Sequence, residues 1–563
     1  MTGKTLTAML DRSAAESPEV AARFWSESET IIYRELAERA RSMAGGLLRE
    51  GVRRGEPVGV LCPNAPEFLV GLFAVLYAGG AAAPLPLPLS GGGRQAASYP
   101  GRLRAVAQAS GMSRILLSHR FGGLAGDLAD GLPGITVLAT DTLGSEPDGL
   151  PAATAQGGLP EVTAPDGLPE VTAQDAAIVQ FTSGSTAAPK GVRLTHGNVV
   201  AGLAAISEGI ALGPGDGGGF WLPLFHDMGL FGTLSAVLSG IPAHVWSPLS
   251  FVRNPARWLG EFAGSGATIT AMPNFGYDHL LAAVTPEEAA DFDLRHWRIA
   301  FNGAEPISQE SVTAFVERFA PAGLRPETVF GVYGMAEATL AVTFPPLGRE
   351  PLFEWVDRDT LSGTGRAVPA EPGAQGSRAV AGVGRPVSGL RLRVADPMTG
   401  QEREEGVVGE ILIQGDPVTS GYLTAEPGAD ADAFIDGWLR TGDLGYLRGA
   451  ELFVTGRRKE MITVRGANFY PQDVEAAARD TPGLFRGRCV AAAAPDGSQS
   501  MLLIAETTLT GADAEALTTA LRTRIGAELG LSEVSVHLVA PRSIPRTSSG
   551  KVQRLAAREL LVS

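Results

Sequence analysis

Helical patterns alternate with short apolar segments through roughly the first 300 residues, and this alternation limits the folds that the chain can adopt. Residues 34–50 place apolar side chains at helical spacing, Val58 to Leu61 follows as a short apolar strand, and Glu67 to Tyr77 is helical again. Strands that alternate with helices are typical of a parallel sheet covered on both faces. The sequence therefore predicts an α/β fold, in which segment 81–89 is too rich in proline for either element.

The chain has 563 residues, too many for one hydrophobic core. Residues 438–446 and 451–459 have the pattern of a hairpin, and a helix is expected to begin near Pro471. We therefore place a boundary near residue 458, with a large N-terminal α/β domain at 1–458 and a small α+β C-terminal domain at 459–563.

Charge and cysteine content exclude several classes of function. The net charge is −15, which argues against a nucleic-acid partner because phosphate-backbone binding needs a basic face. The two cysteines, Cys62 and Cys489, cannot form a disulfide framework, and no metal-ligand spacing of His and Cys occurs. Neither a signal peptide nor an apolar stretch of 18 residues is present, so a cytoplasmic protein without a membrane span is expected.

Residues 180–193, QFTSGSTAAPKGVR, have the composition of a phosphate-binding loop. Lys190 supplies a positive charge, and the apolar run 176–181 before the loop and the helical pattern 198–206 after it place the loop at a strand-to-helix turn. Because proline precedes the lysine and glycine follows it, this is not a Walker A loop. A flexible polar turn is the alternative. The hydroxyl and glycine positions are Thr182, Ser183, Gly184, Ser185 and Thr186.

Residues 148–174 contain three nine-residue units, each with Gly-Leu-Pro. This period is too short to stack into a solenoid with its own core. A surface loop enlarged by duplication is the preferred interpretation, because loops tolerate insertions at little cost in free energy.

Five further motifs follow the phosphate loop in order, and with it the chain resembles the adenylate-forming superfamily of acyl and aminoacyl ligases over almost its whole length. The motifs are FNGAEPIS at 301–308, VYGMAEATL at 332–340, WLRTGDLGYL at 438–447, VTGRRKEMITVRG at 454–466 and PRTSSGKVQ at 545–553. The resemblance implies that a carboxylate and ATP, with Mg²⁺, become an acyl-adenylate and pyrophosphate. It also implies that the N-terminal domain has a β-rich subdomain.

The resemblance assigns a role to each motif. Lys190 and the hydroxyl loop would hold the β- and γ-phosphates, and Glu337 would help to hold Mg²⁺. Asp443 would accept hydrogen bonds from both ribose hydroxyls, and Arg457 would assist at the ribose. The residues expected to wall the nucleotide are Asn302, Gly303, Ala304, Glu305, Tyr333, Gly334 and Met335.

Catalytic roles are implied for Lys190, His226 and Lys551, and Lys551 would stabilise negative charge on the α-phosphate as the carboxylate attacks. The small C-terminal domain of this superfamily is mobile, and its hinge corresponds to Lys459. A core tyrosine, a turn aspartate or a solvated lysine would be the structural alternative for any one of these residues.

Residues 220–230, FWLPLFHDMGL, lack the Phe-Asp-x-Ser pattern of aminoacyl-activating domains, so an α-amino acid is not the expected substrate. With MPNFGYDHL at 272–280 this segment looks like the fatty acyl-AMP ligases. These enzymes transfer a fatty or related acyl group to the phosphopantetheine thiol of an acyl carrier protein, in lipid, polyketide or other secondary-metabolite biosynthesis. The acyl pocket expected by this resemblance is formed by Phe225, Met228, Gly229, Phe275 and Tyr277.

Residues 351–386 match the insertion that this subgroup carries, although their composition also fits an ordinary loop. Two alternatives stay open for the activity: an acyl-CoA ligase, and a homologue that binds or transfers acyl-adenylate without forming it. The aromatic side chains of His244, Trp246, Phe275 and Tyr277 either line a pocket for an aryl acid or fill the core.

Overall fold

The structure is a computed structural model. It describes residues 3–88, 99–143, 167–181, 189–426, 428, 430–464, 467–494, 500–531, 534–546 and 552–559. The hydroxyl residues 182–186, most of the nine-residue repeats and Lys551 lie outside the described residues. Within the described ranges, no helix combines the length and apolar composition that a membrane crossing requires.

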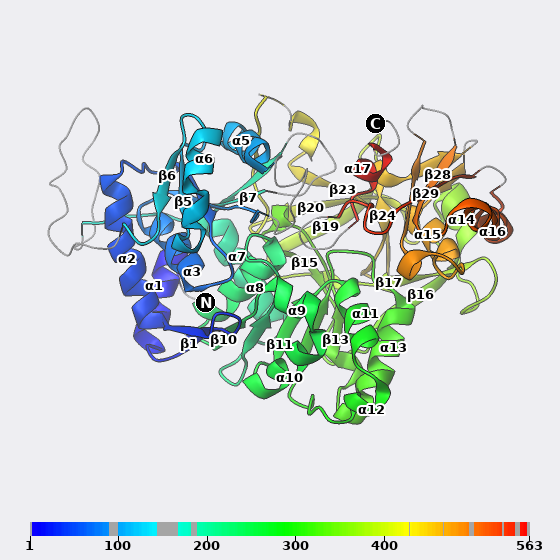
Figure 1. Ribbon diagram of the computed structural model, residues 1–563, viewed down its shortest axis with the longest axis horizontal. Helices are drawn as coiled ribbons and strands as arrows, with labels where there is room; N and C mark the ends of the chain where they lie inside the picture. Colours follow the sequence, from blue (N-terminus) through cyan, green and yellow to red (C-terminus); the bar gives the residue numbers. More distant parts are fainter. Residues whose placement is uncertain are drawn as a thin grey trace.

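The first of two large sheets has the strand order β21-β8-β7-β4-β3-β5-β6 (Figure 1). Strands β4, β3, β5 and β6 run parallel, as the alternating pattern predicts. The strands are β3 (Pro57–Leu61), β4 (Ala81–Pro84), β5 (Arg114–Leu117), β6 (Thr136–Ala139), β7 (Ala176–Phe181), β8 (Gly191–Thr195) and β21 (Tyr422–Leu423). The helices in this part of the chain are α1 (Leu6–Glu16), α2 (Tyr33–Arg49), α3 (Pro66–Tyr77), α5 (Tyr99–Ser110), η1 (His119–Leu124) and α6 (Ala125–Gly131).

The second large sheet has the order β13-β12-β11-β9-β10-β1-β2, and its strands are parallel except for the β1/β2 pair. Its strands are β1 (Ala21–Phe24), β2 (Glu29–Ile32), β9 (Gly218–Phe220), β10 (Ala243–Val245), β11 (Ile269–Met272), β12 (Ile299–Asn302) and β13 (Val329–Gly331). The accompanying helices are α7 (His196–Gly209), α8 (Asp227–Leu238), α9 (Pro248–Arg253), α10 (Pro255–Ser265), α11 (Asn274–Ala283), α12 (Pro286–Ala289), α13 (Gln309–Phe319), η2 (Ala320–Ala322) and η3 (Pro326–Thr328).

A β-rich part follows in the sequence and lies between these sheets and the C-terminal elements in Figure 1. Its main sheet has the order β16-β17-β24-β23-β20-β19, with β22 paired to β23, and a second sheet has the order β14-β15-β18. The elements are β14 (Tyr333–Gly334), η4 (Ala336–Ala338), β15 (Ala341–Phe344), β16 (Leu352–Asp357), α14 (Arg358–Thr364), β17 (Ser377–Gly382), β18 (Arg385–Pro386), β19 (Leu390–Ala395), β20 (Gly409–Gly415), η5 (Ala431–Ala433), β22 (Phe434–Ile435), β23 (Trp438–Arg448) and β24 (Glu451–Arg457). The antiparallel pairing of β23 with β24 confirms the predicted hairpin.

The C-terminal region, drawn in orange and red in Figure 1, packs around hydrophobic clusters of its own residues. It contains a two-stranded sheet, β25-β26, and a three-stranded sheet, β27-β28-β29, together with helices, in agreement with the predicted α+β composition. The elements are η6 (Arg458–Glu460), β25 (Ile462–Val464), β26 (Ala467–Phe469), α15 (Pro471–Arg479), η7 (Phe485–Gly487), β27 (Cys489–Ala493), β28 (Met501–Glu506), α16 (Gly511–Leu529), β29 (Val534–Val539) and α17 (Arg554–Glu559).

Two local predictions were wrong. The predicted loop 81–89 begins instead with the buried strand β4, because Ala81 to Ala83 supply the small side chains and N–H groups that a parallel strand needs and Pro84 stands at its end. The phosphate loop does not lead from a strand into a helix. It joins β7 to β8, which are antiparallel, and α7 begins only at His196, after β8. The strands on either side of the loop therefore pair as a hairpin.

Residues 351–386 contain regular structure rather than an ordinary loop alone. Strands β16 and β17 pair along their whole length, from Leu352 opposite Gly382 to Asp357 opposite Ser377, and α14 lies between them in the sequence. Strand β17 also joins β24, where Gly382 pairs with Phe453. Segment 351–386 thus extends the main sheet of the β-rich part. Strand β24 of that sheet leads into the C-terminal region.

Candidate active site

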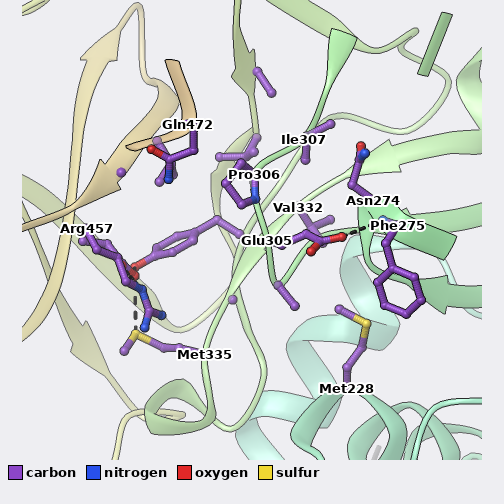
Figure 2. A pocket seen from close by; sticks show the side chains of 18 of the residues that line it. Met228, Asn274, Phe275, Glu305, Pro306, Ile307, Val332, Met335, Arg457 and Gln472 are labelled. Atoms are coloured by element: carbon purple, nitrogen blue, oxygen red, sulfur yellow. Dashed lines mark hydrogen bonds and ion pairs between the residues drawn. The ribbon is translucent and has the colours of Figure 1, made fainter. Parts of the chain in front are cut away.

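A cavity of about 2090 Å³ is bordered both by the residues before 458 and by the C-terminal region. Figure 2 shows Met228 and Phe275 on one side of it and Arg457 and Gln472 on the other. The described residues that flank the phosphate loop, Phe181 and Pro189, border this cavity, and so do Arg546 and Val552, which flank the segment with Lys551. The two predicted lysine-bearing loops are therefore attached at the same cavity.

Asp443 lies at the centre of a hydrogen-bonded group in the wall of the cavity. It faces Arg457 directly across the β23/β24 pair, and its Oδ1 forms an ion pair of 2.9 Å with the Arg457 Nε. The Tyr333 hydroxyl donates to its Oδ2 at 2.7 Å. Burial raises the pKa of Tyr333 well above its usual value, and the Asp443 carboxylate raises the pKa of Arg457. The carboxylate is thus held in a fixed orientation, and each oxygen keeps a lone pair for a further donor.

The chain beside Tyr333 makes a tight turn that requires glycine. A Cβ on Gly334 would lie 2.1 Å from the Leu340 carbonyl oxygen, closer than any side chain can come. The Met335 N–H donates to the same oxygen at 2.8 Å. Gly334, Met335 and Glu337 all border the cavity, so this turn presents the predicted metal ligand to it.

Glu337 and Lys190 both lie near Tyr422. The Tyr422 hydroxyl donates to the Glu337 Oε1 at 3.0 Å, and the Lys190 Nζ is 5.8 Å from the centre of the tyrosine ring. Burial raises the pKa of Glu337, and the nearby negative charge of Asp227 adds to this shift. A carboxylate in such a place favours a bound cation, because positive charge offsets both effects.

The fit of Mg²⁺ to these residues depends on the substrate phosphates. Among the described residues, no group of three or more His, Cys, Asp or Glu side chains has the arrangement of a metal site. Mg²⁺ commonly binds through one or two carboxylates together with substrate phosphates and water. Glu337, beside the lysine of the phosphate loop, fits that arrangement.

Two residues of segment 302–305 border the cavity, and the other two lie behind it. Asn302 is fully buried, and its Nδ2 donates to the Asn274 Oδ1 at 3.4 Å; neither it nor Gly303 borders the cavity. Ala304 and Glu305 do border it. The Phe275 N–H donates to the Glu305 Oε1 at 2.6 Å, an interaction drawn in Figure 2. We therefore assign the first two residues to positioning the other two.

The residues predicted for the acyl pocket do not all reach the cavity. Met228 and Phe275 border it, as does His226 at the start of α8. Tyr277 is fully buried, and its hydroxyl donates to the Ala300 carbonyl at 2.9 Å. A Cβ on Gly229 would lie 2.3 Å from the Pro223 carbonyl oxygen, so that glycine serves close packing.

Phe225 does not border the cavity either, and its backbone carbonyl accepts a hydrogen bond of 2.8 Å from the Gln180 side chain. Of the four side chains considered for an aryl pocket, only that of Phe275 borders the cavity. His244 accepts from the Trp25 Nε1 at 3.2 Å, and Trp246 stacks on the Trp25 ring at 5.4 Å. These aromatic side chains belong to the core.

Lys459, the predicted hinge, borders the cavity within the short helix η6. The residue before it, Arg458, forms an ion pair of 3.2 Å with Glu410 of β20. The residue after it, Glu460, forms an ion pair of 2.8 Å with Arg554 of α17. Lys459 therefore lies between a residue that is bound to the β-rich part and a residue that is bound to the C-terminal region.

The segment 351–386 contacts the C-terminal region through two arginines. Arg378 forms an ion pair of 3.2 Å with Asp473, donates to the Thr455 carbonyl at 2.8 Å and lies 4.3 Å from the centre of the Tyr470 ring. Arg358 is 3.7 Å from the Glu528 carboxylate. Tyr470 is buried in a hydrophobic cluster with residues of the segment.

Sequence reasoning missed the roles of Tyr422, Arg378 and Asp473. Tyr422 follows Thr-Ser-Gly at 419–421, a turn signal that pointed only to a loop. The partner of Arg378 is 95 residues away along the chain, so no local pattern reveals the pair.

The chain is similar in sequence and in fold to proteins of known function. The AMP-binding enzyme family matches residues 10–423. The medium-chain-fatty-acid–[acyl-carrier-protein] ligase JamA of Moorena producens is 33% identical over 94% of this chain and 90% of that protein. The 4-hydroxyphenylalkanoate adenylyltransferase of Mycobacterium tuberculosis is 32% identical over 99% of this chain and 92% of that protein. A solved structure from work on the fatty acyl-adenylate ligases of E. coli and L. pneumophila superimposes with a TM-score of 0.89 at 32% identity, covering 99% of this chain and 97% of that one.

Proposed function

Because the chain belongs to the AMP-binding enzyme family and is similar to fatty acyl-AMP ligases, we propose that it activates a fatty or related carboxylic acid with ATP. The products are acyl-AMP and pyrophosphate, and the acyl group then passes to the phosphopantetheine thiol of an acyl carrier protein. The name of JamA supports both the class of acid and the acceptor.

The observation that carries this proposal is the position of Asp443. Its carboxylate, held by Tyr333 and Arg457, borders the same cavity as the flanking residues of both lysine-bearing loops. Lys190 and Glu337 border the same cavity, so the phosphates of a nucleotide whose ribose binds at Asp443 would lie in a space that these two side chains also border. Retention of these groups also argues against a homologue that only binds an adenylate.

In the first step, a carboxylate oxygen of the acid attacks the α-phosphorus of ATP, the bond to the bridging oxygen of the β-phosphate breaks, and pyrophosphate leaves. The residues of the chain contribute position and charge. Lys190 and the hydroxyls at 182–186 hold the β- and γ-phosphates, and Lys551 stabilises charge at the α-phosphate. Mg²⁺, held by Glu337 and the phosphates, supplies further positive charge when bound.

In the second step, the thiol sulfur attacks the acyl carbonyl, AMP leaves, and the thiol proton passes to solvent. His226, at the start of α8, is the cavity residue that we assign to the acyl carbonyl. We further propose that residues 459–563 form a mobile domain that rotates about Lys459 between the two steps. Rotation must break the contacts of Arg378 with Asp473 and of Arg358 with Glu528.

Those contacts favour a carrier protein as the acceptor of the acyl group. The nearest alternative is an acyl-CoA ligase, in which coenzyme A is the acceptor. They hold the C-terminal region against segment 351–386, so the second step needs an acceptor that offsets their loss. A carrier protein supplies a surface as well as a thiol, whereas coenzyme A supplies only a small ligand.

The test offers coenzyme A and a phosphopantetheinylated carrier protein separately to the enzyme with ATP and a fatty acid, and follows acyl-AMP, acyl-CoA and acyl-carrier protein by mass spectrometry. We expect acyl-AMP to persist with coenzyme A and to be consumed with the carrier protein. Rapid acyl-CoA formation would instead identify an acyl-CoA ligase, and the absence of acyl-AMP in every arm would refute the activation step.

A further inference from the structure

Tyr422 interacts with both of the charged groups that the proposed function assigns to the ATP phosphates. Its hydroxyl donates to the Glu337 Oε1 at 3.0 Å. The Lys190 Nζ is 5.8 Å from the centre of its ring, within the range of about 6 Å over which an aromatic face attracts an ammonium group. All three residues border the cavity. One side chain therefore interacts with a cation and a carboxylate that are more than 140 residues apart in the sequence.

The backbone of Tyr422 is fixed beside the end of the phosphate loop. Strand β21 pairs antiparallel with β8, so that Tyr422 lies opposite Val192 and Leu423 lies opposite Gly191. Strand β8 begins at Gly191, the residue after Lys190. The position of the tyrosine relative to Lys190 therefore follows from the register of two strands.

The segment that leads into β21 also holds the turn that carries Glu337. The Thr419 N–H donates to the Glu337 carbonyl oxygen at 2.7 Å, and the Thr419 hydroxyl donates to the Arg193 carbonyl of β8 at 2.6 Å. The Thr339 hydroxyl, two residues after Glu337, donates to the Pro417 carbonyl at 3.2 Å. Both threonines are buried, so water does not compete for these bonds. Residues 417–422 thus join β8 to the Glu337 turn.

Tyrosine suits this place because it is neutral. A hydroxyl that donates to a carboxylate holds one of its oxygens in a fixed direction, and an aromatic face attracts an ammonium group without an ion pair. A charged side chain at residue 422 would instead neutralise either Lys190 or Glu337. Tyr422 can orient both groups and leave their charges available to phosphate and to a cation.

We propose that Tyr422 is a positioning residue for the adenylation step. Its hydroxyl orients the Glu337 carboxylate as a Mg²⁺ ligand, and its ring orients the Lys190 ammonium toward the phosphates of the same ATP. This inference rests on the ATP- and Mg²⁺-binding part of the proposed function. It adds that the hydroxyl of Tyr422 contributes to the strengthening of ATP binding by Mg²⁺, whereas its ring contributes to ATP binding without the metal.

The experiment measures ATP binding by calorimetry with and without Mg²⁺, in the absence of any acid, so that no turnover occurs. The ratio of the two dissociation constants reports how strongly Mg²⁺ and ATP favour each other's binding. Tyr422→Phe keeps the ring and removes only the hydroxyl. We expect its affinity for ATP without Mg²⁺ to stay within about twofold of the wild type. The ratio should fall about tenfold, the loss typical when a metal ligand loses its hydrogen-bond partner.

Two further variants complete the test. Tyr422→Leu removes the ring as well, and should bind ATP without Mg²⁺ about threefold more weakly than Tyr422→Phe does. Tyr446→Phe is the matched control, because the Tyr446 hydroxyl also donates to a glutamate, at 2.6 Å from the Glu354 Oε2, and neither residue borders the cavity. Both dissociation constants of this control should equal those of the wild type.

The outcomes separate this inference from the proposed function. An unchanged ratio in Tyr422→Phe, or an equal loss of ATP affinity with and without Mg²⁺, would overturn the role of the hydroxyl. Equal affinity of Tyr422→Leu and Tyr422→Phe for ATP without Mg²⁺ would overturn the role of the ring. If the variants respond as expected but the wild type shows no acid-dependent pyrophosphate exchange, the proposed function is wrong and this inference stands.

Discussion

Replacement of Arg378 with alanine tests whether segment 351–386 restrains the C-terminal region. The guanidinium contacts Asp473, the Thr455 carbonyl and the Tyr470 ring, and the Arg378 and Asp473 side chains are only 13% and 10% exposed. Burial raises the pKa of Asp473, and the positive charge of Arg378 opposes that shift. Arg378→Ala therefore leaves a buried carboxyl group without its counter-charge.

Loss of one partner from a buried ion pair costs about 3 kcal/mol or more. That cost falls on the arrangement in which the C-terminal region contacts the segment, so its population relative to open arrangements should drop about 100-fold. Asp473→Asn removes the same interaction from the other side and should act in the same direction. Arg391→Ala, at an exposed position of β19, is the matched control.

Limited digestion with trypsin reports the open population, because Arg457, Arg458 and Lys459 precede the cleavable bonds at the hinge. We expect faster cleavage there in Arg378→Ala and Asp473→Asn than in the wild type or Arg391→Ala. Acyl-CoA formation should rise, and the rate of adenylation should not. Unchanged cleavage and unchanged acyl-CoA formation in both variants would refute the restraint.

Four further predictions concern single side chains. Lys551→Ala should lower the rate of acyl-AMP formation about 100-fold or more and leave ATP affinity largely intact, since its charge matters mostly where negative charge develops; single-turnover assays and calorimetry check the two parts. Asp443→Ala should weaken ATP binding by about 1.5 to 3 kcal/mol without changing the KM of the acid, and normal ATP affinity by calorimetry would exclude the ribose role. Because burial raises the pKa of Glu337, apparent Mg²⁺ affinity should fall as the pH drops toward that pKa; Glu337→Gln should weaken Mg²⁺ binding and remove this pH dependence, which a titration of activity against Mg²⁺ at several pH values measures. Burial lowers the pKa of His196 to about 4, below its unfolded value of about 6.5, so about 3 kcal/mol of stability present above pH 6.5 should be lost as the pH falls toward 4; denaturant unfolding should show a smaller loss in His196→Gln.

The sequence predicts the parts of this site that depend on local pattern. Asp443 lies on the first strand of a hairpin and Arg457 on the second, and turn and strand patterns in the sequence predict this hairpin. The pairing of the two residues follows from the register of β23 and β24. Gly334 follows from its motif, and the backbone contact with Leu340 explains why glycine is needed there. These features need only residues close in sequence.

Features that depend on distant packing were not predictable in this way. Tyr277 and Phe275 are two residues apart on α11, yet only Phe275 borders the cavity, because α11 turns Tyr277 toward the backbone of β12. Strand β8 is only five residues long, so the apolar pattern of the following helix obscured it and made the phosphate loop look like a strand-to-helix turn.

Acid-dependent exchange of labelled pyrophosphate into ATP tests the activation step most directly, because exchange requires reversible formation of acyl-AMP at the cavity that Asp443 and Lys190 border. We expect exchange with decanoate and Mg²⁺, none without the acid, and a loss of at least 100-fold in Lys551→Ala. Exchange that is independent of the acid, or no exchange with any straight-chain acid from butanoate to hexadecanoate, would contradict the proposed activity.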